Sequence, residues 1–282
     1  MIKGIAAYLE KVNKPLKIEN IFVSEPDFGQ VLVKVINSSI CGRQISEING
    51  AKGKDKFLPH LLGHEGGGIV KKVGLGVSKC KVGDNVVLHW RKSKGIESRF
   101  PIYSNSTGKI GGGLITTFNS SAIISENRLT VIPRSINFDI ASLLGCSLTT
   151  ALGLINNEAK AKIGESILII GSGSVGLSLV QASTLVTCYP IITVDISEEK
   201  LKELVNLSGV ETSSLKKQFP AVAKLGEWRK ATNLLRKRLP SAKIDFDYKR
   251  QLHDLFVKDP LYDSYQWWNF DIVNLPEGLD RI

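Results

Sequence analysis

The chain has 282 residues, a formal net charge of +10 and a hydrophobic content of 43%. These values are typical of a globular protein and exclude wholesale disorder and collagen-like repeats, and at ~100–200 residues per domain the length allows one large domain or two ordinary ones. The positive charge is spread out, with 24 basic and 18 acidic groups in residues 1–211 and 13 and 9 in residues 212–282. A diffuse excess favours a basic surface or an anionic small ligand over nucleic-acid binding.

The four cysteines are too few and too far apart for a disulfide scaffold or a CxxC pair. Reduced thiols and a cytoplasmic location are therefore expected, and the first fifteen residues lack the sustained apolar core of a signal peptide. Residues 166–194 contain no charged side chain, which is long enough to cross a bilayer. Their glycines, proline and hydroxyl side chains favour buried strands and a packed helix instead, so no membrane span is expected.

Residues 1–135 are predicted to be rich in β-strands. Short β-branched runs at 31–36, 68–70 and 86–88 are bounded by Gly, Asp or Asn, and the spacing suggests a barrel-like or rolled sheet. Residues 92–113 are polar and rich in glycine, which predicts a surface loop. The next predicted element is a helical region over residues 137–157.

A different pattern begins at residue 166. A short apolar strand over 166–170 leads through a glycine-rich turn into a helix that ends near Val186. A second strand over 191–194 ends in Asp195 and is followed by a helix over 198–207. This βαβα series is typical of the start of a doubly wound parallel sheet.

The pattern changes again near residue 212. Residues 1–211 hold 24 of the 26 glycines, whereas residues 212–282 hold ten of the 20 aromatic residues and no further apolar strand of the series. A sheet of two strands would leave an apolar edge for this tail or a partner to cover. Helices are predicted at 219–239 and 251–258, an aromatic loop at 262–270, and candidates for covering apolar surface are Trp228, Trp267 and Trp268.

The glycine-rich turn carries a nucleotide-binding pattern. Gly171, Gly173 and Gly176 satisfy G-x-G-x-x-G, in which the glycines serve the tight turn, the approach of a pyrophosphate and close helix–strand packing. Asp195 lies 24 residues after the first glycine, where a carboxylate accepts hydrogen bonds from ribose hydroxyls and favours NAD over NADP. The alternative is a glycine-rich turn without a ligand.

Thiol and imidazole side chains at Cys41, His64 and Cys146 are of the types that zinc prefers, and a catalytic zinc has three protein ligands and an open position. Their long spacing leaves a second interpretation open, with buried structural cysteines and a surface pair of His64 and Glu65.

Four short motifs carry a resemblance to a known family. Gly63–Gly68 reads GHEGGG, and it is accompanied by Cys41–Gly42, Val82–Asp84 and Leu144–Cys146. In order and spacing these pieces resemble the medium-chain zinc-dependent alcohol dehydrogenases over residues 1 to about 211.

The resemblance implies a mixed α/β fold in three parts. A β-rich GroES-like catalytic domain would occupy residues 1–155, and a partial Rossmann unit that binds NAD would occupy residues 156–211. Residues 212–282 match neither part of the family fold and would form a mainly helical, aromatic tail.

The resemblance also implies roles for particular residues. Cys41, His64 and Cys146 would hold a catalytic zinc, with Glu65 beside the metal as a supporting or alternate ligand. The family's mechanism is Lewis-acid catalysis of hydride transfer between an alcohol or aldehyde and NAD, and its members are commonly dimers or tetramers, which leaves a homo-oligomer open. The remaining implied positions are Thr150 near the nicotinamide, Val175 in the glycine turn, and Lys200 beside the adenosine ribose and Asp195.

Three departures from the family pattern stand out. Residues 88–113 contain no cysteine, so one catalytic zinc and no structural zinc is expected. Arg43 stands where a Ser or Thr commonly relays the alcohol proton, and Gln44 stands where Asp is usual. A guanidinium cannot accept a proton at neutral pH, so Ser46 or a water would have to relay it, while Arg43 would meet an anionic substrate or solvent. Finally, residues 212–282 replace the half of the nucleotide fold that grips the nicotinamide.

These departures keep three functional hypotheses in play. The first is an active zinc- and NAD-dependent alcohol dehydrogenase. The second is a truncated or fused non-catalytic relative that retains zinc and adenosine-nucleotide binding, and the third is a module that binds a partner through its C-terminal tail. His60 and His253 are not expected to have a function. His89 is expected either to line the substrate cleft or to have a structural role.

Overall fold

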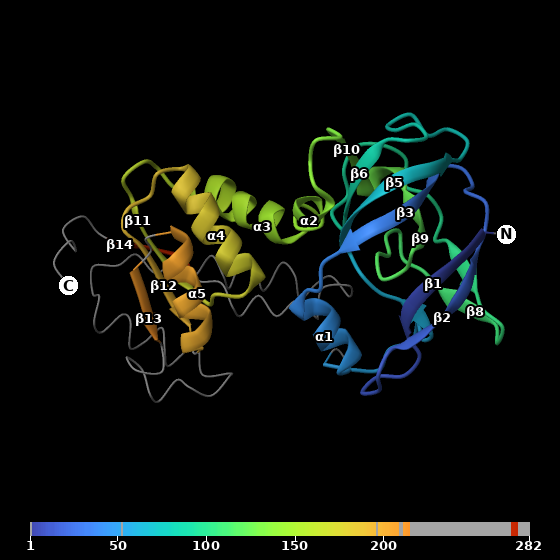
Figure 1. Ribbon diagram of the computed structural model, residues 1–282, viewed down its shortest axis with the longest axis horizontal. Coiled ribbons are helices and arrows are strands. Elements are labelled where there is room, and N and C mark those ends of the chain that lie inside the picture. Colours follow the sequence, from blue (N-terminus) through green and yellow to red (C-terminus); the bar gives the residue numbers. More distant parts are fainter. Residues whose placement is uncertain (1, 52, 196, 209–210, 215–271, 276–282) are drawn as a thin grey trace. The chain divides into compact units, whose positions relative to one another are not determined.

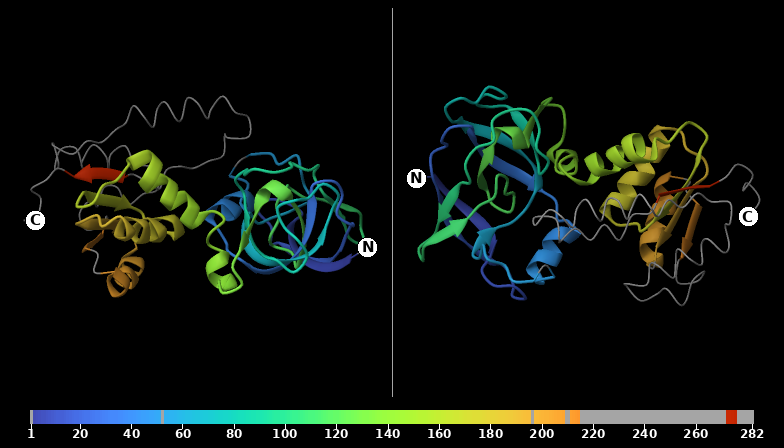
Figure 2. Two further views of the ribbon diagram at one scale, coloured as in Figure 1. Left: turned by 90° about the horizontal axis from the view of Figure 1, so that it is seen from above. Right: turned by 180° about the vertical axis from the view of Figure 1, so that it is seen from behind.

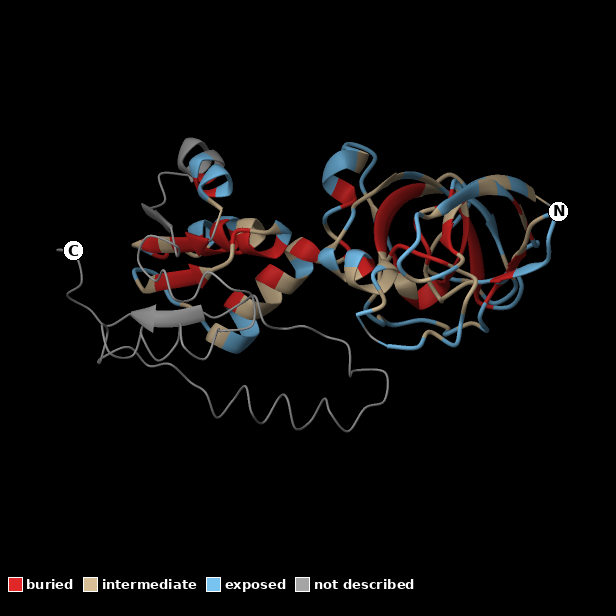
Figure 3. Ribbon diagram, turned by 90° about the horizontal axis from the view of Figure 1, so that it is seen from below, coloured by how far each residue is buried: buried red, intermediate tan, exposed pale blue. Residues whose placement is uncertain are grey.

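The computed structural model describes residues 2–51, 53–195, 197–208, 211–214 and 272–275. The chain divides into two compact units, Met1–Cys146 and Ser147–Ile282, which are described separately (Figure 1). In each of them the buried residues gather on the strands and on the inner faces of the helices (Figure 3).

The first unit combines a closed barrel with a five-stranded sheet (Figures 1 and 2). The barrel order is β1 (Ile2–Leu9), β2 (Lys17–Val23), β7 (Ile102–Ser104), β8 (Lys109–Gly111) and β4 (His60–Leu61). The sheet order is β10 (Leu129–Ile132), β6 (Asn85–His89), β5 (Glu65–Val73), β3 (Gln30–Ser38) and β9 (Ser121–Ser125). The helical elements are α1 (Gly42–Ile48), the 3-10 turn η1 (Glu126–Arg128) and α2 (Phe138–Ala141). The strand-rich, barrel-like expectation for residues 1–135 is thus confirmed, and its three β-branched runs lie in β3, β5 and β6.

Strand β3 explains why residues 31–33 are apolar without alternation. Val31 and Val33 point into the core of the sheet, while Leu32 between them points into the core of the barrel. Successive side chains of a strand point to opposite faces, so a strand that is covered on both faces needs an apolar residue at every position. β3 therefore belongs to both cores of the first unit.

The expectation of a surface loop over residues 92–113 is wrong, because β7 and β8 lie within it. Tyr103 of β7 and Ile110 of β8 are each 1% exposed and belong to the barrel core. The Tyr103 hydroxyl also accepts a hydrogen bond from the Ile123 N–H at 2.8 Å. Each of these three-residue strands buries a single side chain, so the surrounding polar residues dominate the sequence pattern.

The second unit contains the predicted βαβα series. Strand β11 (Ser166–Ile170), helix α4 (Ser174–Leu185), strand β12 (Ile191–Asp195) and helix α5 (Glu198–Ser208) follow in that order. β11 and β12 pair in parallel. Ahead of them, α3 (Ser147–Gly153) and the π-helical turn η2 (Leu154–Ala159) confirm the predicted helical region.

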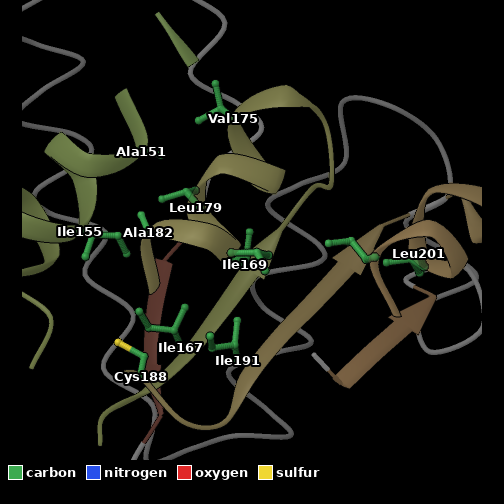
Figure 4. Packing of buried hydrophobic residues seen from close by; sticks show 12 residues of the cluster. Ala151, Ile155, Ile167, Ile169, Val175, Leu179, Ala182, Cys188, Ile191 and Leu201 are labelled. Atoms are coloured by element: carbon green, nitrogen blue, oxygen red, sulfur yellow. The ribbon is translucent and has the colours of Figure 1, made fainter. Parts of the chain in front are cut away.

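The core of the second unit lies between this sheet and its helices. Ile167 and Ile169 of β11, Leu179 and Ala182 of α4, and Leu201 of α5 belong to one cluster of buried side chains (Figure 4). The uncharged stretch 166–194 thus forms a buried strand, a packed helix and a second strand. In the described part of the chain, no helix is both long enough and apolar enough to cross a membrane.

The expectation that the sheet stops at two strands is also wrong. β13 (Glu211–Ser214) pairs in parallel with β12, and β14 (Ile272–Leu275) pairs antiparallel with β11, which gives the order β13-β12-β11-β14. The ETSS sequence of β13 carries no apolar residue, so hydrophobic periodicity cannot detect it. β14 comes from the tail and covers one edge of β11. The helices predicted at 219–239 and 251–258, the aromatic loop with its tryptophans, and His253 lie outside the described residues.

Two glycines of the turn after β11 predict opposite responses to substitution. A Cβ on Gly176 would lie 1.9 Å from the Gly171 carbonyl oxygen, whereas a Cβ on Gly173 would have no neighbour within 4 Å. We expect Gly176→Ala to lower the free energy of unfolding by about 1–3 kcal/mol through backbone overpacking. Gly173→Ala should cost less than about 1 kcal/mol, because only a helix N-cap residue changes. Urea unfolding followed by circular dichroism measures both, and equal losses would contradict the packing role of Gly176.

Candidate functional site

Three predicted metal ligands lie together in the first unit. Cys41 is the residue before α1, His64 precedes β5, and Cys146 ends the unit. One ligand atom of each lies within 4.8 Å of the others, and all three side chains are partly buried. The structure thus brings these residues together over a long sequence separation, in a donor set of two thiols and one imidazole that suits zinc.

Glycines beside His64 and Cys146 allow this close approach. Gly63 has φ +93°, and a Cβ there would lie 2.2 Å from the Thr117 hydroxyl oxygen. A Cβ on Gly145 would lie 2.2 Å from the Leu88 carbonyl oxygen and 2.7 Å from Cβ of Glu65. A larger residue at either position would push a candidate ligand away from the cluster.

Glu65 stands directly behind the cluster. Its side chain is 1% exposed, and Oε2 accepts a hydrogen bond from the Cys146 N–H at 2.8 Å. The Glu65 carbonyl oxygen accepts another from the Ser38 hydroxyl at 3.1 Å, which links β5 to β3. The carboxylate therefore holds the backbone of Cys146 in place, and its role as an alternate metal ligand stays a prediction.

The cysteines have very different electrostatic surroundings. The pKa of Cys41 is lowered to about 4, first by a hydrogen bond from Cys146 and also by hydrogen bonds from the His64 side chain and the Arg43 backbone, although burial opposes the shift. Cys41 is therefore a thiolate at neutral pH, the form that binds metal. By contrast, burial and the charges of Asp84 and Glu126 raise the pKa of Cys80 to about 11. None of the four cysteines forms a disulfide.

Gln44 contacts the cluster, although the sequence marked it only as a departure from the family. Its side chain is 2% exposed, Oε1 accepts the Cys41 N–H at 2.9 Å, and Nε2 contacts Nδ1 of His64. With Oε1 held by a donor, the amide N–H faces Nδ1 and makes it the acceptor, so the proton of the neutral imidazole lies on Nε2.

Metal binding favours the opposite arrangement. A histidine that coordinates through one nitrogen normally donates its other N–H to a carboxylate or a carbonyl. For His64 to bind through Nε2, the Gln44 amide must rotate, and the Cys41 N–H then loses its acceptor at a cost of about 1 kcal/mol. Gln44 therefore opposes the His64 tautomer that is protonated at Nδ1, whereas a carboxylate at position 44 would support it.

The glycine turn between β11 and α4 has the features that its three glycines predict. Gly171 lies between β11 and α4 with φ +100°, which serves the tight turn, and the Cα of Gly173 faces open space in which a pyrophosphate could approach. Gly176 touches the turn itself. Val175 is 8% exposed and belongs to the buried cluster of the second unit (Figure 4).

Asp195 lies at the end of β12, against this turn. Its Oδ2 accepts hydrogen bonds from the Ser172 N–H at 2.6 Å and from the Ser172 hydroxyl at 2.8 Å, and Oδ1 accepts the Ser197 N–H at 2.8 Å. Burial acts to raise its pKa, but these bonds and the charge of the exposed Lys200 outweigh burial and lower the pKa. The carboxylate is thus ionised, with Lys200 near it. Thr150 lies partly buried on α3.

Two histidines have structural surroundings of different kinds. His89 is bonded at both nitrogens, through Nδ1 to the Arg91 carbonyl at 2.8 Å and through Nε2 to the Thr130 hydroxyl at 3.0 Å. This arrangement favours the structural role for His89. His60 instead belongs to a second cluster of potential metal ligands, with Glu47 and Asp55.

Comparisons with known proteins agree with this arrangement. Residues 27–134 match the family model described as the alcohol dehydrogenase GroES-like domain. The S-(hydroxymethyl)glutathione dehydrogenase of Synechocystis sp. is 31% identical over an alignment of 228 residues that covers 71% of this chain and 61% of that protein. The corresponding Candida maltosa protein is 31% identical over 221 residues, covering 69% and 58%. The matched part of the chain belongs to the medium-chain zinc-dependent alcohol dehydrogenase family.

Solved structures show the same fold. The alcohol dehydrogenase zinc-binding domain protein from Burkholderia ambifaria aligns with a TM-score of 0.69 at 23% identity, covering 76% of this chain and 65% of that one. Benzyl alcohol dehydrogenase from Acinetobacter calcoaceticus aligns with a TM-score of 0.67 at 24% identity, covering 79% and 67%. This chain spans about 61% of the length of the curated relatives from Synechocystis sp. and Escherichia coli.

The lowered pKa of Cys41 predicts its alkylation kinetics. In metal-free protein, the rate of Cys41 alkylation should be nearly constant from about pH 5.5 to 8, because its thiolate is fully formed above a pKa of about 4. The rate at Cys80 should rise about tenfold per pH unit over the same range, since its pKa lies well above it. Pulsed iodoacetamide labelling with mass spectrometry measures both sites, and a tenfold rise per unit at Cys41 would exclude the thiolate.

Gln44 predicts a gain in metal affinity from a single substitution. Gln44→Glu keeps an acceptor for the Cys41 N–H and offers a second carboxylate oxygen to the N–H at Nδ1 of His64. We expect zinc to bind at least ~10-fold more tightly in this variant. Competition with a chromophoric chelator measures the affinity, with Ile45→Ala, exposed on the same helix, as the control. Unchanged affinity in Gln44→Glu would show that the amide does not oppose zinc binding.

Proposed function

We propose that this chain is a zinc- and NAD-dependent oxidoreductase that transfers hydride between an alcohol or aldehyde and NAD. The observation that carries the proposal is the cluster of Cys41, His64 and Cys146, preorganised in a unit of the alcohol dehydrogenase fold. The open glycine turn with the ionised Asp195 beside it supports NAD as the cofactor.

The residues of the cluster fit zinc by their chemistry. Two sulfur ligands and one imidazole leave a fourth tetrahedral position for the substrate, and Cys41 is already deprotonated. The proposed enzyme would hold one catalytic zinc and no four-cysteine structural zinc, because residues 88–113 contain no cysteine. Four cysteines without a disulfide agree with a cytoplasmic location, and a homo-oligomer stays a prediction.

When bound, zinc supplies a Lewis acid that lowers the pKa of the substrate hydroxyl, and NAD supplies the hydride acceptor. The chain's own contribution is placement. Cys41, His64 and Cys146 would fix the metal, and Glu65 would keep Cys146 in position through its N–H. The glycine turn would admit the pyrophosphate, and Asp195 would exchange its bond with the Ser172 hydroxyl for bonds to the ribose hydroxyls.

Arg43 points to the kind of substrate. Since a guanidinium cannot accept the alcohol proton, that proton would leave through Ser46 or a water molecule. A cation two residues after the candidate ligand Cys41 instead favours a substrate with an anionic group. The relatives named S-(hydroxymethyl)glutathione dehydrogenase make that glutathione adduct the first compound to test. Thr150 would lie near the nicotinamide and Lys200 near the adenosine ribose.

The proposed domain division assigns residues 1–155 to the catalytic domain and residues 156–211 to a partial nucleotide unit. Residues 212–282 would replace the rest of the family's nucleotide fold. Because the chain spans only 61% of its relatives from Synechocystis sp. and Escherichia coli, a non-catalytic relative that keeps the zinc and adenosine sites is the second candidate. The third candidate is a module that binds a partner through residues 212–282. Most of these residues lie outside the described part of the chain.

The deciding experiment combines turnover and binding. We expect NADH to form, measured by its absorbance, when the zinc-loaded chain receives NAD and a panel of simple alcohols, benzyl alcohol and S-(hydroxymethyl)glutathione. Calorimetric titration with NAD and ADP-ribose runs in parallel. Binding of ADP-ribose without reduction of NAD by any alcohol would favour the non-catalytic relative.

The ligand assignment has its own test. Cys41→Ser should lower the zinc content measured by atomic absorption, because a serine hydroxyl does not supply a thiolate ligand. Cys80→Ser, at a half-buried thiol outside the cluster, is the matched control. Unchanged zinc in Cys41→Ser would refute the assignment.

Asp195→Ala tests the nucleotide site. Loss of an ionised hydrogen-bond acceptor should weaken NAD binding by about 10–100-fold, as measured by calorimetry. Glu199→Gln removes an exposed carboxylate on α5 and should leave the affinity unchanged. Equal NAD affinity in wild type and Asp195→Ala would mean that the ribose is bound elsewhere.

A further inference from the structure

A second group of metal-ligating side chains lies in the first unit. Glu47 is on α1, Asp55 is in the segment between α1 and β4, and His60 begins β4. One ligand atom of each lies within 4.8 Å of the others. The side chains of His60 and Asp55 are only 12% and 15% exposed. None of the three residues belongs to the cluster of Cys41, His64 and Cys146, called the cysteine cluster below.

The hydrogen bonds of His60 fix its tautomer. Nδ1 lies 2.9 Å from the Leu61 carbonyl oxygen, which can only accept, so Nδ1 carries a proton. Nε2 lies 2.9 Å from Oδ2 of Asp55. Two lone pairs that face each other at this distance repel, so a proton or a cation must lie between Nε2 and Oδ2.

The arrangement suits a cation in three respects. Ligands about 2.1 Å from an octahedral metal lie about 3.0 Å apart, close to the separation of Nε2 and Oδ2. The other Asp55 oxygen accepts the Phe57 N–H at 2.8 Å, which holds the carboxylate in position. A proton would join His60 to Asp55 alone, whereas a divalent ion would be coordinated by Glu47 as well.

We propose that Glu47, Asp55 and His60 form a second metal site, which takes a divalent transition ion such as zinc with water in its remaining positions. A nitrogen ligand beside two carboxylates favours such an ion over magnesium or calcium. The donation from Nδ1 to a backbone carbonyl is the usual support of a coordinating histidine. The expectation of one zinc counted cysteines only, so it does not bear on this oxygen- and nitrogen-based site.

The site would tie α1 to β4. Helix α1 carries Gln44 and directly follows Cys41, so an ion held by Glu47 would steady the element beside the cysteine cluster. This proposal stands apart from the proposed oxidoreductase activity, since it concerns different ligands.

Cobalt titration of a full-chain Cys41→Ser/Cys146→Ser variant tests the proposal. Without those thiols, we expect one Co²⁺ per chain with weak d–d absorption and no thiolate-to-cobalt charge-transfer band. Asp55→Asn, His60→Gln and Glu47→Gln, each in that background, should weaken binding at least ~10-fold. Glu25→Gln removes an exposed carboxylate that pairs with Lys72 and should leave binding unchanged.

Two results of the cobalt titration would overturn the second metal site. No Co²⁺ binding at millimolar concentration would overturn the proposal and leave a proton, not a metal ion, between His60 and Asp55. Binding that survives all three substitutions would overturn it as well. Should His60→Gln fail to fold, judged by circular dichroism, Glu47→Gln on α1 still decides, because its residue lies outside the barrel strands. The charge-transfer band of the unsubstituted chain reports separately on the cysteine cluster.

Discussion

The candidate metal centre depends on one buried carboxylate. Glu65 begins β5 and receives the N–H of Cys146, so the last residue of the first unit is tied to the strand that follows His64. Burying a carboxylate without partners is costly, and the bond to Cys146 offsets part of that cost only when the loop carrying Cys146 lies against β5. Gly145 makes the approach possible, and the placement of the third ligand follows from it.

The sequence predicted those parts of the fold that have a regular hydrophobic pattern or a known motif. The β-branched runs of β3, β5 and β6 and the βαβα series showed a clear period, and the glycine turn after β11 had a known spacing. The strands β7, β8 and β13 are three or four residues long, and each offers too few apolar side chains for periodicity to detect. Their pairing partners, not their composition, make them strands.

A similar limit applied to the candidate sites. Cys41, His64 and Cys146 were found by their motifs, and the structure shows that they lie together. The contact of Gln44 with His64 depends on how α1 follows Cys41, which spacing alone does not show. His60 looked incidental because Glu47 and Asp55 come from a helix and a loop whose meeting is set by tertiary packing. The one sequence feature that could have drawn attention to His60 is its place directly before the apolar residues Leu61 and Leu62.

Strand β3 gives the first unit a mechanical property. Leu32 enters the barrel core from one face of the strand, and Val31 and Val33 enter the sheet core from the opposite face. Displacement of β3 would therefore disturb both cores. Because a shift of register by one residue would exchange the two sets of side chains, slippage along β3 would disrupt both cores together. We therefore expect the barrel and the sheet to unfold together, and the cluster of Cys41, His64 and Cys146 to be lost or kept with them.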